Sequence, residues 1–230
     1  MRDAAPAHAN ALLAGMPTTE RTGFARRLTR VNLSFGEMLY DTKPIRNVYF
    51  PLDCLVSLLA PLKDHCALEV GMVGNEGMLG VPLALGVRTS AVLAIVQGTG
   101  TALRMDAVSF RRELQISTAL HTGIYRYIHS LMGQLTQTAV CTAFHPIEAR
   151  CARWLLMTRD RMGSDQVELT QEFLARMLGV RRVGVTEAAS SLQRQGLIEY
   201  SRGHIVIVDA KGLAAIACEC YTVVKNLYHA

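Results

Sequence analysis

Short apolar runs separated by turn-forming residues occupy the stretch from about Val31 to Arg104. Runs such as "VYFPL", "CLVSLLA", "ALEVGMVG" and "SAVLAIVQGTGTALRM" are bounded by Gly, Pro and Asp. Runs of this length are typical of strands in an antiparallel sandwich or barrel. The preceding stretch "NALLAGMPTTERTGFARRLTRV" predicts small helices packed on the outside of these strands.

A helical pattern follows from Ser117 to Phe144, and no proline interrupts it. About 28 residues at roughly 1.5 Å each give a rod of roughly 42 Å, long enough to join two domains. Either its apolar stripe packs on the chain's own strand domain, or it forms the seam of a parallel dimer, and the length favours the dimer. The stripe consists of Leu120, Ile124, Tyr127 or Ile128, Leu131, Leu135 and Thr138 or Ala139.

His145-Pro146 predicts the end of this rod and a domain boundary, because the residue before a proline is pushed out of the helical region. The stretch "IEARCARWLLMTRDRMG" then predicts an amphipathic helix. Basic residues are expected away from its apolar face. That face is formed by Ile147, Cys151, Trp154, Leu155 and Met162.

Two short amphipathic helices are predicted next, with a tight glycine turn between them. Thr170 is a candidate N-cap, and Gly179 ends the first helix. Gly196 ends the second helix. The inner face of the first helix is expected to contain Phe173, Leu174, Met177 and Leu178, and that of the second Val183, Val185, Ala188, Ala189 and Leu192. This order predicts a helix-turn-helix.

The stretch "GLIEYSRGHIVIVD" predicts a β-hairpin that turns at Arg202-Gly203, with apolar positions at Ile198, Tyr200, Ile205 and Ile207. A hairpin in this place is the wing of a winged helix-turn-helix, whose second helix enters the major groove of DNA. The alternative is an ordinary helical hairpin with its arginines in water, and the full order of cap, turn, basic helix and hairpin favours DNA binding. The candidate DNA contacts are Thr170, Arg181, Arg182, Val183, Thr186, Glu187, Ser190 and Arg202.

The composition agrees with a globular protein that has polyanionic partners, without naming one. Lys and Arg number 24 and Asp and Glu 19, which leaves a net charge of +5 and a pI near 9.0. No apolar run is long enough to span a bilayer, and the N-terminus lacks the apolar core of a secretory signal. A cytoplasmic protein with no membrane partner is therefore expected.

The six cysteines do not form the paired C-x-x-C spacings of a zinc site. They are interpreted as reduced, mostly buried thiols. Cys218 and Cys220 are interpreted as ordinary positions on a terminal helix rather than as a metal or redox clamp. No nucleophile elbow, phosphate loop or metal-ligand cluster is found, so an enzyme is not expected.

The stretch "LTQEFLARMLGVRRVGVTEAASSLQRQGLIEYSRGHIVI" resembles the C-terminal domain of the cyclic-AMP receptor protein and fumarate-nitrate regulator (CRP/FNR) family. The resemblance extends over nearly the whole chain, and the helix-turn-helix is its most specific part. It implies an α+β fold. The parts would be a cyclic-nucleotide-binding-like β-roll (a double-stranded β-helix or jelly roll) with N-terminal helices at 1–116, a dimerisation helix at 117–144 and a winged helix-turn-helix at 145–230.

The resemblance implies a homodimeric transcription regulator on a palindromic operator, with the two recognition helices roughly 34 Å apart. Double-stranded DNA and RNA polymerase would be its partners, and a small ligand in the β-roll would control it. The alternative is a sensory module whose helix-turn-helix contacts a protein. The sequence does not name the operator, the target genes, the effector or the sign of regulation.

Position by position, the resemblance places Arg182 at the family's base-reading arginine. Val183 stands where many members have glutamate, and Glu187 stands where the cyclic-AMP receptor protein has arginine. The operator is therefore expected to differ from that protein's operator. Arg181 stands where a serine often caps the recognition helix, which predicts a weaker cap.

For the effector, the resemblance places Arg88, Thr89 and Ser90 at the phosphate-binding end of the nucleotide site. Met78 replaces the glutamate that holds the ribose, which argues against cyclic AMP in its usual pose, because a thioether is a weak acceptor. Arg88 would hold an anion or pair on the surface.

Other cofactors of the family fit the sequence poorly. No cysteine precedes Cys54, so an iron–sulfur cluster of the family's N-terminal kind is not expected. His65 and Cys66 are the one candidate pair for a haem, and a structural role explains them better. No cofactor is predicted.

Overall fold

The computed structural model describes residues 9–41, 43–62, 67–201 and 203–228. The chain forms two compact units. Unit 1 contains residues 1–58 and 72–131, and unit 2 contains 59–71 and 132–230. The division of the chain at 116 and 144 stays a prediction. His65 and Cys66 lie outside the described residues. No helix in the described ranges combines the length and the apolarity that crossing a membrane requires.

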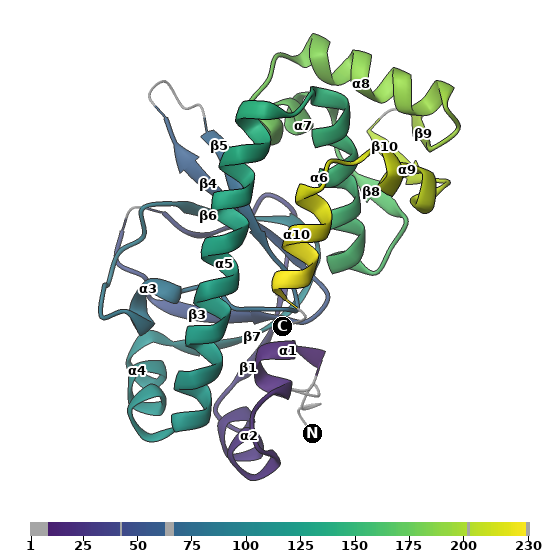
Figure 1. The fold of residues 1–230 in the computed structure, drawn as a ribbon. Coiled ribbons are helices and arrows are strands. Elements are labelled where there is room, and N and C mark those ends of the chain that lie inside the picture. Colours follow the sequence, from purple (N-terminus) through teal and green to yellow (C-terminus); the bar gives the residue numbers. More distant parts are fainter. Residues whose placement is uncertain (1–8, 42, 63–66, 202, 229–230) are drawn as a thin grey trace. The chain divides into compact units, whose positions relative to one another are not determined.

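Antiparallel strands form the centre of unit 1, as the short apolar runs predict (Figure 1). One sheet has the order β1-β7-β3, and the other has the order β2-β6-β4-β5. Two side chains of β3, Val48 and Phe50, are fully buried. The strands within unit 1 are β1 (Thr29–Leu33), β2 (Met38–Tyr40), β3 (Asn47–Pro51), β6 (Leu93–Gly98) and β7 (Gly100–Asp106). Two further strands, β4 (Leu55–Pro61) and β5 (Ala67–Val73), have residues in both units.

Short helices lie before, between and after the strands of unit 1. Asn10 caps the first of them and is fully buried, where its amide donates to the carbonyls of Pro51 (2.9 Å) and Gly77 (2.8 Å). Phe24 packs edge-on against Phe50, with ring centroids 5.7 Å apart. The N-terminal helices therefore belong to the core of this unit. The helices are α1 (Ala11–Ala14), α2 (Thr18–Ala25), α3 (Val81–Ala84) and α4 (Ala107–Ile116).

The long helix α5 runs from Thr118 to Phe144, within one residue of the prediction. The prediction that the apolar stripe of this helix forms the dimer seam is wrong about the face of the helix. Leu120 and Ile124 are fully buried and Leu131 is 8 % exposed, so this part of the apolar stripe packs inside the fold of the single chain. Further along, Leu135 and Thr138 are half-buried and Ala139 is exposed. Burial of apolar area stabilises a fold. Because Leu120, Ile124 and Leu131 are buried in the chain's own core, they are not free to form a dimer seam.

Unit 2 is built around α6 (Ile147–Met162), which contacts α8, α9 and α10. The basic residues were expected away from the apolar face, and three of them, Arg150, Arg153 and Arg161, are nevertheless buried with polar partners. Arg150 donates to the carbonyl of Leu178, and Arg161 donates to that of Met157 (3.1 Å). A helix surrounded by neighbours on several sides has no purely solvent face on which to place them.

The remaining elements of unit 2 follow the predicted order of two helices and a hairpin, with two C-terminal helices added. A three-stranded sheet has the order β8-β10-β9, so the hairpin gains an extra strand that the pattern did not reveal. The elements are β8 (Gln166–Glu168), α7 (Gln171–Leu178), α8 (Arg182–Arg194), β9 (Ile198–Ser201), β10 (His204–Ile207), α9 (Ala210–Ile216) and α10 (Cys220–Leu227).

Candidate nucleic-acid interface

The first helix of the motif, α7, begins and ends as its sequence predicts. The hydroxyl oxygen of Thr170 accepts from the backbone N–H of Phe173 (3.1 Å), which satisfies one free donor at the helix start. Gly179 ends the helix with φ +62°, a conformation that glycine adopts without a Cβ clash. Leu174, Met177 and Leu178 are buried, and Phe173 is half-buried.

The second helix, α8, buries one face and exposes the other. Val185, Ala188, Ala189 and Leu192 are buried as expected. Val183 was expected both on the inner face and among the DNA contacts, and the inner placement is wrong because its side chain is 60 % exposed. Gly184 lets α6 come close, since a Cβ on it would lie 2.8 Å from Cδ1 of Ile147.

The candidate contacts on α8 share the exposed face. Their side chains are all solvent-exposed: Arg181, Arg182, Val183, Thr186, Glu187 and Ser190. Arg181 is the N-cap and makes no side-chain capping bond, which agrees with the predicted weaker cap. The hydroxyl of Thr186 lies 2.8 Å from Oε1 of Gln171, so it also links α8 to α7.

The hairpin pairs β9 with β10 in the register Ile198↔Ile207 and Tyr200↔Ile205. Ile198, Ile205 and Ile207 are buried, and Gly203 in the turn has φ +89°. The wing is therefore held by one apolar face. Arg202, the predicted contact at its tip, lies outside the described residues.

This arrangement has the chemistry of a DNA reader. Arginine can bond both acceptors of a guanine, glutamate can accept from a cytosine amine, and valine can touch a thymine methyl. The N-terminus of α8 adds a partial positive charge that attracts phosphate. Which of these side chains reach a base stays a prediction.

Arg88 lies in a basic pocket of unit 1 whose volume is about 480 Å³. Lys43, Arg46 and Arg111 line the pocket together with Arg88, and Asp106 is its one acidic member. Thr89 and Ser90 do not line it. Ser90 is 8 % exposed, and its hydroxyl accepts from the backbone N–H of Val92 (3.1 Å).

Gly77 and Met78, the positions that the resemblance matches to the family's ribose-binding pair, lie among buried side chains. Met78 is 1 % exposed. The ring of Tyr127, 5 % exposed, lies so close to Gly77 that a Cβ there would overlap it. A carboxylate of Glu76 accepts from the backbone N–H of Gly74 (3.0 Å).

A group of side chains that the sequence interpretation set aside comes together in unit 2. Cys141, His145, Cys218 and Cys220 place their ligand atoms within 4.8 Å of one another. A hydrogen bond with Cys218 lowers the pKa of Cys141 to about 5, and the charge of Arg153 acts in the same direction. The statement that the chain has no metal-ligand cluster is therefore wrong. The signals that could have found it are the C-x-C pair and the C-x-x-x-H spacing at a helix end.

Comparisons with known proteins agree with these features. A model of the Crp-like helix-turn-helix domain matches residues 149–216. The structure is similar to that of a protein from Eubacterium rectale ATCC 33656 assigned to the CRP/FNR family of transcriptional regulators. That match has a TM-score of 0.68 and 15 % identity, and it covers 91 % of this chain and 98 % of that one.

It is also similar to FixK2 from Bradyrhizobium japonicum, with a TM-score of 0.70 and 15 % identity over 83 % of this chain and 98 % of that one. The c-di-GMP responsive global regulator CLP of Xanthomonas campestris matches with a TM-score of 0.67 and 18 % identity over 83 % and 99 %. No curated protein sequence matches the chain. The family model covers the helix-turn-helix part of the chain, and the structural likeness shows the fold of the whole. The chain carries a Crp-like helix-turn-helix domain on the fold of the CRP/FNR family of transcription regulators.

Proposed function

We propose that this protein is a homodimeric, sequence-specific DNA-binding transcription regulator that reads a palindromic operator through α8. The observation that carries the proposal is the two-sided character of α8. Val185 and Leu192 are fully buried, whereas Arg181 and Arg182 at the helix start are exposed. A helix held by its inner face and basic at its outer N-terminal end suits the major groove.

The dimer in this proposal uses the exposed side of α5, opposite the buried stripe. Exposed residues recur there at alternating intervals of four and three, the spacing of a coiled-coil seam. Met132 is 62 % exposed and Tyr125 is 47 % exposed, so the seam offers apolar area. The seam residues are Thr118, Thr122, Tyr125, His129, Met132, Thr136, Ala139 and Ala143.

The small-ligand part of the proposal rests on the basic pocket of Arg88. Four cationic side chains around one pocket favour an anionic ligand. By the resemblance, Met78 stands in place of the ribose-binding glutamate, and its side chain is buried, so the ligand would bind in another pose. By the family resemblance, RNA polymerase would be a further partner, and a regulator of chromosomal genes would act in the cytoplasm.

The test is selection of binding sites from random duplex DNA with the purified protein at near-physiological salt. We expect a two-fold symmetric motif with half-sites about one helical turn apart, roughly 34 Å. Light scattering of the same sample measures the oligomeric state, and Met132→Lys should weaken the dimer by placing like charges in the seam. A protein that binds the motif as a monomer would contradict the dimer.

Salt dependence separates this function from the alternative in which the helix-turn-helix contacts a protein. Phosphate contacts release counterions, so affinity for DNA should fall on the order of 10³-fold between about 50 and 200 mM salt. A weak, salt-insensitive association with DNA, with no enriched motif in the presence or absence of cyclic nucleotides, would favour the protein contact.

A further inference from the structure

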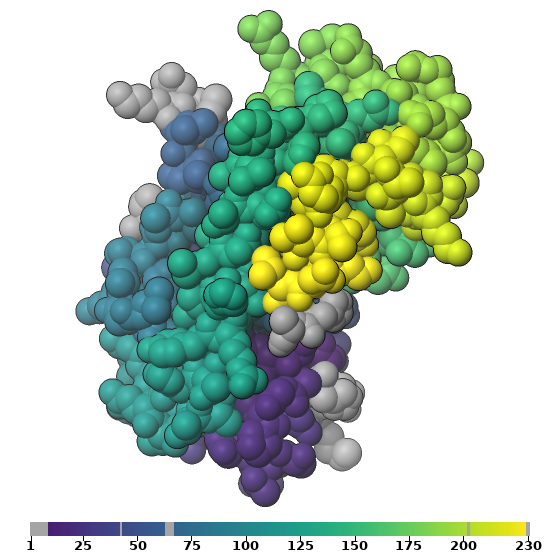
Figure 2. Space-filling view, in the orientation of Figure 1, coloured from purple at the N-terminus to yellow at the C-terminus, as the bar shows by residue number. Residues whose placement is uncertain are grey.

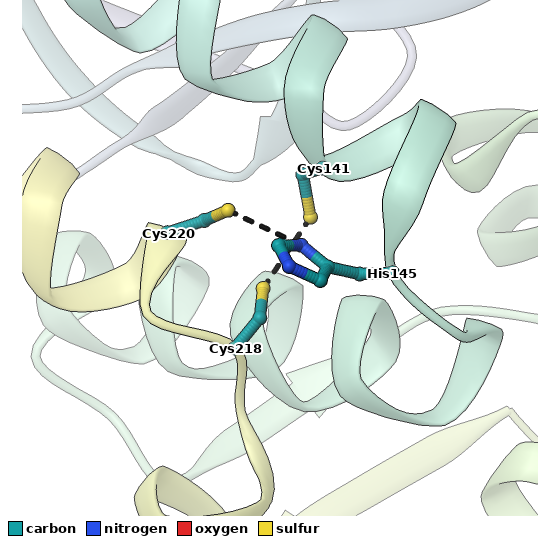
Figure 3. Close-up of side chains that lie close together, drawn as sticks. All are labelled: Cys141, His145, Cys218 and Cys220. Atoms are coloured by element: carbon teal, nitrogen blue, oxygen red, sulfur yellow. Dashed lines mark hydrogen bonds between the residues drawn. The ribbon is translucent and has the colours of Figure 1, made fainter.

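The end of α5 and the segment between α9 and α10 bring three cysteines and a histidine to one point (Figure 3). Cys141 lies in the last turn of α5. His145 follows one turn later, and its backbone N–H donates to the carbonyl of Cys141 (3.1 Å). Cys218 and Cys220 lie on either side of Glu219 at the start of α10. Figure 3 shows the four side chains pointing toward a common centre.

The spacing of the ligand atoms fits one tetrahedral ion. Sγ of Cys141 lies 3.4 Å from Sγ of Cys218, and Sγ of Cys220 lies 3.4 Å from Nδ1 of His145. Bonds of about 2.3 Å to sulfur and about 2.0 Å to nitrogen, at tetrahedral angles, separate the ligand atoms by roughly 3.5–3.8 Å. An iron–sulfur cluster inserts several atoms between its ligands and needs a wider site.

The partners of these ligands are also those of a metal site. His145 directs Nδ1 at Cys220 and places Nε2 3.3 Å from Oε1 of Glu219. A histidine that binds a metal through one ring nitrogen commonly donates its other N–H to a carboxylate, which fixes the ring and its tautomer. The side-chain amide of Gln137 donates to Sγ of Cys220 (3.1 Å), a bond that favours the thiolate.

Charge provides an independent argument. Arg150 and Arg153 on α6 are each 8 % exposed, and their charges act on Cys141. Within the described parts of the chain, neither guanidinium has a carboxylate at ion-pair distance. Buried charges require compensation. Three thiolates and a neutral imidazole around a divalent cation carry a net charge of −1, which would supply it.

We propose that Cys141, His145, Cys218 and Cys220 bind a single zinc ion in a closed, structural site. Three thiolates and one imidazole are a ligand set that zinc takes in structural sites, and no position is left open for a substrate. The ion joins the end of α5 to the start of α10. Along the same two helices, Gln134 donates to the hydroxyl of Tyr228 (2.8 Å), and Figure 2 shows α10 lying against the second half of α5.

The site has a consequence for the winged helix-turn-helix. α10 packs on α6, and α6 also contacts α8. Zinc binding therefore steadies the helices that support the recognition helix, and loss of zinc loosens them. The thiolates must be deprotonated to bind, so folding of this region and metal binding are coupled.

The experiment measures metal content of the full-length protein purified without chelators and without a metal-affinity column. We expect one zinc per chain by elemental analysis. Cys220→Ala should lose the zinc, whereas Cys151→Ala should keep it, because Cys151 is also buried in unit 2 but lies outside the cluster. Zinc at less than one tenth per chain, or zinc retained equally in both variants, would overturn the proposal.

Cobalt titration of the zinc-free protein tests the ligand set directly. We expect a thiolate-to-cobalt charge-transfer band together with the visible bands of tetrahedral Co²⁺. His145→Cys should keep the metal and change the spectrum, and this variant remains informative if Cys220→Ala does not fold. Glu219→Gln should weaken metal affinity by about 10-fold to 100-fold. Absence of the charge-transfer band would contradict the site.

Two further readouts do not need DNA, so they stand apart from the proposed regulatory function. Removal of zinc by a chelator under reducing conditions should lower the unfolding midpoint by about 10 °C. Thiol counting of the denatured, unreduced protein should find Cys141 and Cys218 free. A disulfide between them in freshly purified protein would overturn the proposal, because a disulfide removes two of the four ligands.

Discussion

The candidate ligand positions of the winged helix-turn-helix and of the β-roll differ in their exposure to solvent. On α8 the candidate contacts, Arg182 and Val183 among them, are exposed and backed by a buried face. In the β-roll the position of the family's ribose-binding glutamate is held by a buried Met78, beside Gly77 and the ring of Tyr127. The candidate positions of one region are exposed, and those of the other are part of its core.

The difference lies in exposure: the candidate contacts of α8 face solvent, whereas Met78 and Tyr127 are buried. A fold by itself does not fix the ligand, because function depends on the side chains of the site. A substitution at a buried position such as Gly77 should therefore change the free energy of unfolding. A substitution at an exposed position of α8 should change the affinity for DNA. Three experiments use this contrast, in order of decreasing expected effect.

The buried position is tested by Gly77→Ala. A Cβ at Gly77 would overlap the buried ring of Tyr127. We expect a loss of about 3 kcal/mol in the free energy of unfolding, the upper part of the range for overpacked cores. Urea denaturation measures it.

Two companions make the Gly77→Ala result specific. Gly23→Ala on α2 meets nothing within 4 Å. This exposed helical position should gain about 0.5–1 kcal/mol, because alanine favours the helix. In a Tyr127→Leu background, Gly77→Ala should destabilise far less than in the wild type. If Gly77→Ala lowers the free energy of unfolding equally in both backgrounds, the ring of Tyr127 is not what excludes a side chain at Gly77.

The exposed face of α8 is tested by Arg182→Ala. The free energy of unfolding should change little, because the side chain is exposed. Affinity for the selected operator should fall by about 1–3 kcal/mol, with relaxed preference at one base position. Arg194→Ala, at the other end of the same helix, is the control. Equal losses on operator and random DNA would make Arg182 a phosphate contact instead.

The smallest effect is expected at the start of α8, for Arg181→Ser. The present N-cap makes no side-chain capping bond, and a serine hydroxyl can accept from a free N–H at the helix start. The free energy of unfolding should rise by about 0.5–1 kcal/mol while the salt slope of DNA binding falls by about one. A variant that loses both stability and affinity would show that Arg181 already caps the helix by another route.

Signals between near neighbours predicted the helices and strands well. Contacts between segments distant in sequence, and the burial they cause, could not be predicted, because they depend on how those segments pack. Thr170, Gly179 and the short helix between them follow from capping and periodicity, which act over a few residues. The predicted apolar stripe of α5 is real, but its partner is the same chain. Arg150, Arg153 and Arg161 of α6 could not be placed from periodicity, because helices distant in sequence surround α6 and bury them.

The sequence by itself determined the order of the elements, the ends of the long helix and the type of the DNA-binding motif. Only the tertiary structure decided which face of α5 stays exposed and that Tyr127 lies over Gly77. It also brought Cys141 to Cys218, which lies 77 positions later in the chain. The physical reason is the separation along the sequence over which each interaction acts. Capping and hydrophobic periodicity act between near neighbours, whereas burial and ligand geometry depend on segments that meet only in the folded chain.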